Sequence, residues 1–342
     1  MANMNIRTPR FYCDKISYLM SRGVAQNGEF DVVGGSGSIA PESGTEAELF
    51  DMNPLNLVTF DTTVNSGDDQ VLVSIDTHST ATQKSFVAIL NHNLNSCTGM
   101  VRIRASDDPA HMVINLGDAT SYTPSDIVNG DVSAGFVKPD VDGSTIITFA
   151  AGEQNERYWG IQFEGSNSNK FHNSTKLTVG AIMIGEIFEM PHAPDMNITR
   201  MISYNRMNDL QESYGGQRFS NLKSFGRTAS STSKSPFTTA SNGYDTYGGR
   251  IIYDMNFSFI SAANMMPDEY DIIPNDEDNF VSDVWNMTNG NHLPFIMSID
   301  KDSEGDNAES EHLFCRFANN SLDMKQIAPD MYNISLTVEE EF

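Results

Sequence analysis

The chain lacks the features that mark several large classes of protein. Its 342 residues contain no apolar run of the roughly 18 residues that a membrane span needs, and residues 1–23 lack the apolar stretch of a secretory signal. The three cysteines, Cys13, Cys97 and Cys315, are isolated, with no histidine partner at zinc spacing. We therefore expect no membrane span, no disulfide scaffold and no zinc site, and synthesis in the cytoplasm.

Basic residues are also scarce. Twenty-one Lys and Arg stand against 46 Asp and Glu, which gives a net charge of −25 and argues against binding to nucleic acid. The charge is unevenly spread, because residues 200–250 hold seven basic and three acidic residues, whereas residues 268–311 hold thirteen acids and one lysine. Two interpretations stay open: opposite patches dock copies of the chain against one another, or they neutralise each other within one subunit.

Helical patterns are rare, and most of the chain reads as β-strand. Short apolar or alternating runs recur between clusters of Gly, Asn, Asp, Ser and Pro. The predicted strands span residues 86–90, 100–104, 145–149, 158–163, 176–188, 250–260, 294–299, 312–317 and 332–338. In residues 100–104, Val101 and Ile103 alternate with Arg102 and Arg104, which predicts one core face and one face in water.

Three of these segments carry finer expectations. Gly180 and Gly185 interrupt an apolar strand and predict a bulge or a close backbone approach. One face of residues 250–260 is predicted to lie in the core: Ile251, Tyr253, Met255, Phe257 and Phe259. Residues 277–287 have the best helical spacing, with an apolar face of Phe280, Val281, Val284 and Met287.

The expected organisation is an N-terminal extended arm (1–45), a β-sandwich domain (46–195) and a second β-rich domain (196–342) with one short helix. Residues 213–249, rich in Ser, Thr and Gly, are too long for an ordinary loop and predict an extended arm that a partner surface orders. The candidate interface residues of this arm are aromatic and basic: Phe219, Phe225, Phe237, Arg218, Lys223 and Arg227.

Residues 300–311 approach the pattern of a calcium-binding loop. Acids occupy positions 1, 3, 5, 7 and 12, with Gly305 at position 6, and calcium prefers several hard oxygens around such a turn. The candidate ligands are Asp300, Asp302, Glu304, Asp306 and Glu311. Position 5 is Glu, and strands rather than helices flank the loop, so a solvated acidic hairpin tip is the alternative. Apart from this calcium loop, no cofactor is expected.

No catalytic pattern emerges. The seven histidines form no H-E-x-x-H pair, and Gly34 to Ser38 lacks the remainder of a phosphate loop or nucleophile elbow. Tyr158 and Trp159 could stack on a sugar ring, although core packing is the alternative use of Trp159. The sequence therefore predicts a protein that is not an enzyme.

Three stretches resemble virion structural proteins of tailed bacteriophages. They are residues 7–18 (RTPRFYCDKISY), residues 88–94 (AILNHNL) followed by 101–104 (VRIR), and residues 157–163 (RYWGIQF) leading to 179–185 (VGAIMIG). The resemblance covers mainly residues 1–190. It implies a jelly-roll β-sandwich similar to discoidin-type binding modules, in a tail, baseplate or head-to-tail component.

The leading prediction from the residues and the resemblance together is a virion assembly protein, made in the host cytoplasm, that acts through its interfaces. Its expected partners are other virion proteins and copies of itself in a symmetric ring or tube. Two alternatives remain: a module at the tail tip that binds a receptor or a host surface glycan, and a glycan-degrading tail enzyme, which would need two acids at catalytic separation.

Overall fold

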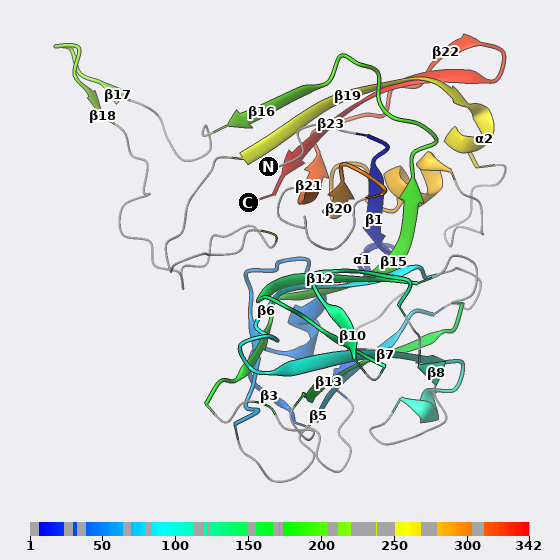
Figure 1. The fold of residues 1–342 in the computed structure, drawn as a ribbon. Helices are drawn as coiled ribbons and strands as arrows, with labels where there is room; N and C mark the ends of the chain where they lie inside the picture. Colours follow the sequence, from blue (N-terminus) through cyan, green and yellow to red (C-terminus); the bar gives the residue numbers. More distant parts are fainter. Residues whose placement is uncertain are drawn as a thin grey trace.

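The structure is a computed structural model, and it describes part of the chain. The described residues are 7–23, 30–32, 39–63, 70–78, 84–112, 120–121, 124–133, 135–149, 155–166, 171, 174–203, 211–219, 237, 250–267, 279–302 and 311–341. Within them the chain is mainly β, as predicted, with large antiparallel sheets and a few short helices (Figure 1). None of the described helices is long and apolar enough to cross a bilayer.

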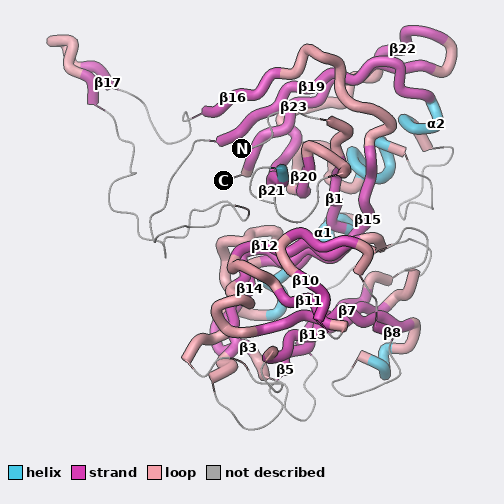
Figure 2. The backbone as a smooth tube through the Cα atoms, viewed as in Figure 1, coloured by secondary structure: helices cyan, strands magenta, loops and turns pink. Residues whose placement is uncertain are grey.

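The largest sheet has eleven described strands and runs through both halves of the molecule (Figure 2). In spatial order they are β16 (Thr199–Ser203), β19 (Arg250–Ser261), β23 (Met331–Glu340), β21 (His312–Phe317), β20 (Phe295–Ser298), β1 (Arg10–Asp14), β15 (Ala181–Glu189), β6 (Phe86–His92), β12 (Gly143–Thr148) and β9 (Asp126–Val128). The eleventh strand, β22 (Lys325–Ala328), also pairs with β23.

A second, seven-stranded sheet belongs to the first half of the chain. Its order is β10 (Asp131–Ser133), β11 (Phe136–Lys138), β7 (Gly99–Ser106), β13 (Tyr158–Gly165), β5 (Gln70–Asp76) and β2 (Phe30–Val32), with β8 (Thr120–Ser121) paired to β7. Apolar residues of β6 and β12 share one core cluster with those of β7 and β13. The two sheets therefore enclose a common core, seen in the lower part of Figure 1.

The remaining elements are small. A three-stranded sheet joins β14 (Leu177–Val179), β4 (Val58–Phe60) and β3 (Pro41–Ser43), and a separate hairpin joins β17 (Gln211–Glu212) and β18 (Arg218–Phe219). The short helices are α1 (Lys15–Ser21), η1 (Glu46–Phe50), η2 (Pro109–His111), α2 (Ala262–Met265) and η4 (Val281–Asn286).

The predicted N-terminal arm is wrong for residues 10–19. Strand β1 lies in the middle of the large sheet, paired with β15 on one side and β20 on the other. Phe11 is 0% exposed, and Asp14 begins α1 by accepting a hydrogen bond from Ser17 N at 2.8 Å. The partners of β1 lie more than 170 residues away, so local sequence gave no sign of its central place.

Strand β15 joins the two halves because it changes its partner along its length. Ala181 to Gly185 pair with β6, and Gly185 to Glu189 pair with β1. Gly185 accepts this crowding because it has no side chain: a Cβ there would lie 1.9 Å from the carbonyl oxygen of Cys13. A Cβ on Gly180, which separates β14 from β15, would lie 2.1 Å from Pro54 O. The predicted close backbone approach is confirmed at both glycines.

The predicted core face of β19 is correct up to Phe257 and wrong at Phe259. Phe257 pairs with Ile334 and Ile260 pairs with Tyr332, so two residues of β19, Ser258 and Phe259, stand opposite one residue of β23. This is a β-bulge. Phe257 and Ile260 are both buried, whereas Phe259 is 67% exposed at a φ of 64°.

Two further expectations are refined. The apolar face predicted for residues 277–287 is confirmed, since its four residues are buried, but the described turn there is π-helical and spans Val281–Asn286. The water-facing side predicted for residues 100–104 is wrong at Arg104, which is 6% exposed. Its guanidinium approaches the side-chain oxygen of Gln162 in the neighbouring strand at 3.4 Å.

Candidate functional site: a polar groove over β19 and β23

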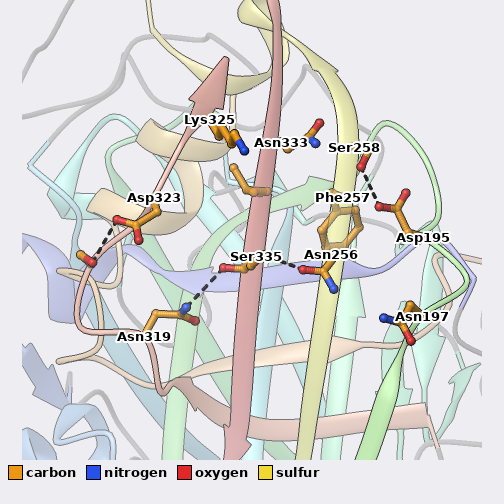
Figure 3. Close-up of a pocket in the computed structure, with 12 residues that line it drawn as sticks. Asp195, Asn197, Asn256, Phe257, Ser258, Asn319, Asp323, Lys325, Asn333 and Ser335 are labelled. Atoms are coloured by element: carbon orange, nitrogen blue, oxygen red, sulfur yellow. Dashed lines mark hydrogen bonds between the residues drawn. The ribbon is translucent and has the colours of Figure 1, made fainter. Parts of the chain in front are cut away.

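A cavity of about 530 Å³ opens on the outer face of the large sheet in the second half of the chain (Figure 3). We call it the polar groove. It is lined by Asp195, Asn197, Asn256, Phe257, Ser258, Asn319, Ser321, Asp323, Lys325, Asn333, Ile334 and Ser335. Ten of these twelve side chains are polar, which sets the groove apart from an apolar ligand pocket.

The floor of the groove follows from the alternation of two paired strands. In β19 and β23 every second side chain enters the core, and the polar residues between them face outward. Across the pair, Ser335 donates to Asn256 Oδ1 at 2.5 Å, and Thr337 donates to Asp254 Oδ1 at 2.7 Å. The floor is therefore a row of amides and hydroxyls, and Asp254 and Thr337 continue the cross-strand hydrogen bonds beyond it.

Two loops form the walls. On one side Asp195 receives a hydrogen bond from the Ser258 hydroxyl at 2.7 Å, and its backbone N–H donates to the Asn256 carbonyl at 2.8 Å. On the other side Asn319 donates to the carbonyl of Ser335 at 3.2 Å (Figure 3). Both walls are therefore bonded to the strands of the floor.

The end of the groove lies at the bulge. Because Phe257 and Ile260 both point inward, the two bulged residues between them lie on the outer face of the sheet, which brings Phe259 beside Ser258. The backbone N–H of Phe259 donates to Asn333 Oδ1 at 3.1 Å. Phe259, which is exposed and is not itself part of the lining, is thus the residue next to Ser258 of the groove.

The groove retains polar atoms for a ligand. Asn197 has no hydrogen bond to any residue that the structure describes, and the same is true of the amide nitrogens of Asn256 and Asn333. Lys325 has no ion pair within the described part of the chain. The arrangement can hold a neutral molecule rich in hydroxyl groups.

The sequence patterns do not predict this groove. Asn256, Ser258, Asn333 and Ser335 looked like the ordinary solvent face of two strands. A signal was present in the sequence, because both strands carry Asn and Ser at alternating outward positions. Their pairing across some 80 residues, and the loops that wall them in, could not be derived from local pattern.

The predicted calcium loop is only partly described. Asp300 is buried and meets Arg7 at 3.3 Å, and Asp302 pairs with Lys301 at 2.9 Å, a hydrogen bond that lowers the pKa of the Asp302 carboxyl. Glu311 is buried. Glu304 and Asp306 lie outside the described residues, and within the described ones no group of three or more acids, histidines and cysteines could hold a metal ion.

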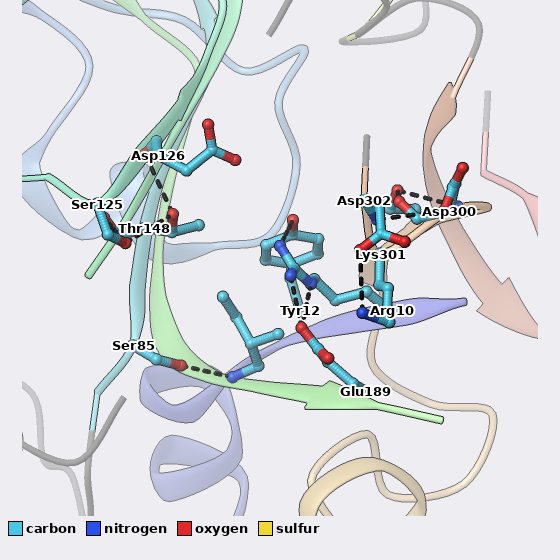
Figure 4. Close-up of polar contacts among 12 residues, drawn as sticks. Arg10, Tyr12, Ser85, Ser125, Asp126, Thr148, Glu189, Asp300, Lys301 and Asp302 are labelled. Carbon is cyan, nitrogen blue, oxygen red and sulfur yellow. Dashed lines mark hydrogen bonds and ion pairs between the residues drawn. The ribbon is translucent and has the colours of Figure 1, made fainter. Parts of the chain in front are cut away.

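Basic side chains of the same chain surround the described start of this loop. Arg10 forms an ion pair with Glu189 and also approaches the Tyr12 hydroxyl at 3.4 Å (Figure 4). Burial raises the pKa of Tyr12, so its hydroxyl stays protonated at neutral pH. A calcium ion would have to separate Asp302 from Lys301 and approach these cations.

The predicted interface residues fall in different places. Phe237 is 4% exposed and stacks on His312 of the same chain, with ring centroids 5.8 Å apart, so its ring is not available to a neighbouring subunit. Arg218 and Phe219 form strand β18. Phe225, Lys223 and Arg227 lie outside the described residues.

The predicted sugar platform divides between core and surface. Trp159 is 0% exposed, and its indole N–H donates to the Glu156 carbonyl at 2.9 Å. It therefore packs in the core, the alternative use named for it, and cannot stack on a ligand. Tyr158 is half-buried, with the Arg157 guanidinium 5.0 Å from its ring centroid.

A comparison of the chain with models of protein families, with curated proteins and with solved structures gives no match. The functional argument therefore rests on the residues and geometry described above.

Proposed function

We propose that this protein is a structural component of a tailed-bacteriophage virion, a tail, baseplate or head-to-tail protein that acts through contacts between subunits. In this proposal the region 46–195 is a jelly-roll sandwich of the discoidin type, and copies of the chain form a symmetric ring or tube. The resemblance of residues 7–185 to such proteins supports the assignment. The observation that carries it is a hairpin whose described hydrogen bonds are all formed between residues of the hairpin itself.

Strands β17 and β18 form that hairpin, which stands apart from the sheets in Figure 1. Its turn is held by Ser213 N–H to Gln217 O at 2.7 Å and by Gly216 N–H to Ser213 O at 2.8 Å. Tyr214 at the tip is fully exposed. A two-stranded hairpin is marginally stable in water by itself, so a partner surface gives this one a reason to persist.

The edge of the large sheet supports the same proposal. Among the described strands, β16 is the outermost on the side of β19, and it carries Met201 and Ile202 at 40% and 53% exposure. An edge strand with apolar side chains is a template for pairing with a strand of another chain. Strand β16 also precedes the hairpin in the chain, so one neighbour could contact both.

The test replaces the hairpin and leaves the rest of the chain unchanged. Residues 211–219 are exchanged for a Gly/Ser linker of equal length, which leaves Phe237 in its buried position. We expect the unaltered chain to form rings or tubes in electron micrographs, and the variant to stay monomeric with an unchanged melting temperature. Tyr158→Ala, on the other half of the molecule, is the control and should assemble normally.

Two results would contradict the proposal. One is an unaltered chain that sediments as a monomer at all concentrations and is absent from tailed particles labelled with antibodies against it. The other is a hairpin variant that assembles as well as the unaltered chain.

A further inference from the structure

We propose that the polar groove binds an uncharged oligosaccharide, with the Phe259 ring stacked on one sugar at the end of the groove. The inference goes beyond the proposed function and does not depend on it, because binding is a property of the single chain and assembly is assigned to the hairpin.

The lining has the hydrogen-bonding character that sugars require. A sugar hydroxyl both donates and accepts, and the groove offers both kinds of partner within one cavity: amides at Asn197, Asn256 and Asn333, and carboxylates at Asp195 and Asp323. Several of these side chains already hold one hydrogen bond that fixes their position and keep another atom free. A prepositioned polar group loses little entropy when it binds a ligand.

The charge of the groove and of the whole chain indicates which class of oligosaccharide can bind. The groove contains Asp195 and Asp323 against Lys325 alone, and the whole chain carries a net charge of −25. An acidic sugar chain would be repelled by both the groove and the protein field, whereas a neutral one is not. We therefore assign the site to neutral chains rather than to sugars that bear carboxylates.

The bulge supplies an independent observation. Phe259 is a bulky residue held at a φ of 64° with its side chain 67% exposed. Residues other than Gly, Asn and Asp rarely adopt this conformation, and burial in a core does not stabilise the ring here. Strained residues of this kind cluster at ligand sites. A flat apolar ring beside hydroxyl-binding groups fits the C–H face of a sugar while its hydroxyls meet the amides.

The size of the groove agrees with an oligosaccharide. A cavity of about 530 Å³ lies within the roughly 300–1,000 Å³ of small-molecule sites. Its floor follows two antiparallel strands, so a chain can lie along it with successive sugars over successive outward side chains.

The experiment screens the purified full-length chain against an array of bacterial oligosaccharides that includes neutral members and members containing uronic acid. The strongest neutral binder is then titrated by calorimetry. The first variant is Phe259→Gly, which removes the ring and suits the backbone angle, and the second is Asn197→Ala, which breaks no hydrogen bond to a described residue. We expect each variant to lower the affinity by about tenfold or more.

The controls are two exposed or half-exposed tyrosines outside the groove, Tyr158→Ala and Tyr214→Ala, which should bind as the unaltered chain does. The melting temperature of every variant is measured, so that a loss of binding is not read from an unfolded sample. Failure of all neutral members of the array to bind overturns the proposal. So do full affinity in both groove variants, loss of affinity in Tyr158→Ala, and a preference for the members containing uronic acid.

Discussion

Each half of the molecule has a row of polar side chains on a sheet, and the two rows differ in what covers them. In the seven-stranded sheet, Gln70, Gln162 and Arg104 of β5, β13 and β7 are all less than 7% exposed, and they hydrogen bond to one another. On β19 and β23 the corresponding row faces the groove, and part of its hydrogen-bonding capacity is free. A polar group buried in a sheet has to be satisfied within the protein, whereas an open one can serve a ligand.

The same contrast holds for apolar side chains. Strand β6 is buried on both faces, with Val87 and Ile89 in one cluster and Phe86, Ala88 and Leu90 in the other. Strands β19 and β23 bury one face only. The large sheet is therefore covered on both faces at β6 in the first half, whereas one of its faces is open at β19 and β23 in the second half.

The strand that joins the halves gives the largest expected effect. Gly185→Ala should destabilise the chain by more than about 4 kcal/mol or prevent folding, because its Cβ would collide with backbone that cannot move away. Gly215→Ala in the hairpin turn is the matched control, since its Cβ would meet nothing closer than 4.0 Å. Denaturant unfolding measures both, and near-equal stability of the two variants would refute the joining role of β15.

How far the sequence predicts this fold depends on the range of each interaction. Alternation located β19 and β23 correctly, because the period of side chains along a strand is local. The glycines within residues 176–188 also predicted a close backbone approach, because Gly inside a strand usually marks a bulge or a site where another backbone comes close. The first failure was β1, whose neighbours in the sheet come from the middle and end of the chain.

The site was less predictable than the fold. The outward position of Phe259 results from one extra residue in β19, and nothing in the alternation of residues 250–260 reveals that insertion. Phe237 was expected at an interface because of the Ser, Thr and Gly around it, yet it is buried, whereas the buried position of Trp159 agrees with the core packing predicted as one of its two uses. Burial depends on which distant segments cover a side chain, and single-sequence patterns do not contain that information.

A second prediction concerns the apolar cluster on the outer side of the large sheet. Phe237 packs there with residues of both halves, among them Tyr12, Phe86 and Phe314. Phe237→Ala should cost about 3 kcal/mol, the usual effect of removing a buried phenylalanine. Tyr214→Ala is the control from the same region of the sequence and should change stability little, because Tyr214 is fully exposed. Equal thermal stability of the two variants would show that Phe237 does not tie its segment to the body.

A third prediction concerns the pH dependence of the unfolding free energy. Each half of the molecule contains a buried histidine that should lower this stability in acid. Burial lowers the pKa of His92 in β6 and of His312 in β21 to about 4, from an ordinary value of 6.5. Between these values the unfolded chain binds the proton and the folded chain does not, so stability is lost as the pH falls from 6.5 toward 4. From pH 7.5 to pH 5 each histidine should remove about 2 kcal/mol of unfolding free energy.

Their surroundings differ, which sharpens the comparison. The ring of His92 bonds Thr145 at 2.9 Å and accepts from Leu94 N at 3.3 Å, whereas Nδ1 of His312 has no hydrogen-bond partner in the described structure. Urea unfolding of His92→Gln and His312→Gln at both pH values should show a smaller loss in each variant than in the unaltered chain. An unchanged loss in either variant would mean that its histidine is already charged in the folded state.

The smallest expected effect on stability is that of substituting Phe259, on the open face of β19. Phe259→Gly should change the unfolding free energy by less than about 1 kcal/mol, because relief of the strained backbone and the greater freedom of glycine in the unfolded chain oppose each other. A bulged residue that packed like its neighbours Phe257 and Ile260 would instead cost about 3 kcal/mol when truncated. Phe257→Ala supplies that reference on the same strand. If both substitutions destabilise the chain equally, the ring of Phe259 belongs to the core of the second half, and that half has no free aromatic face to offer a ligand.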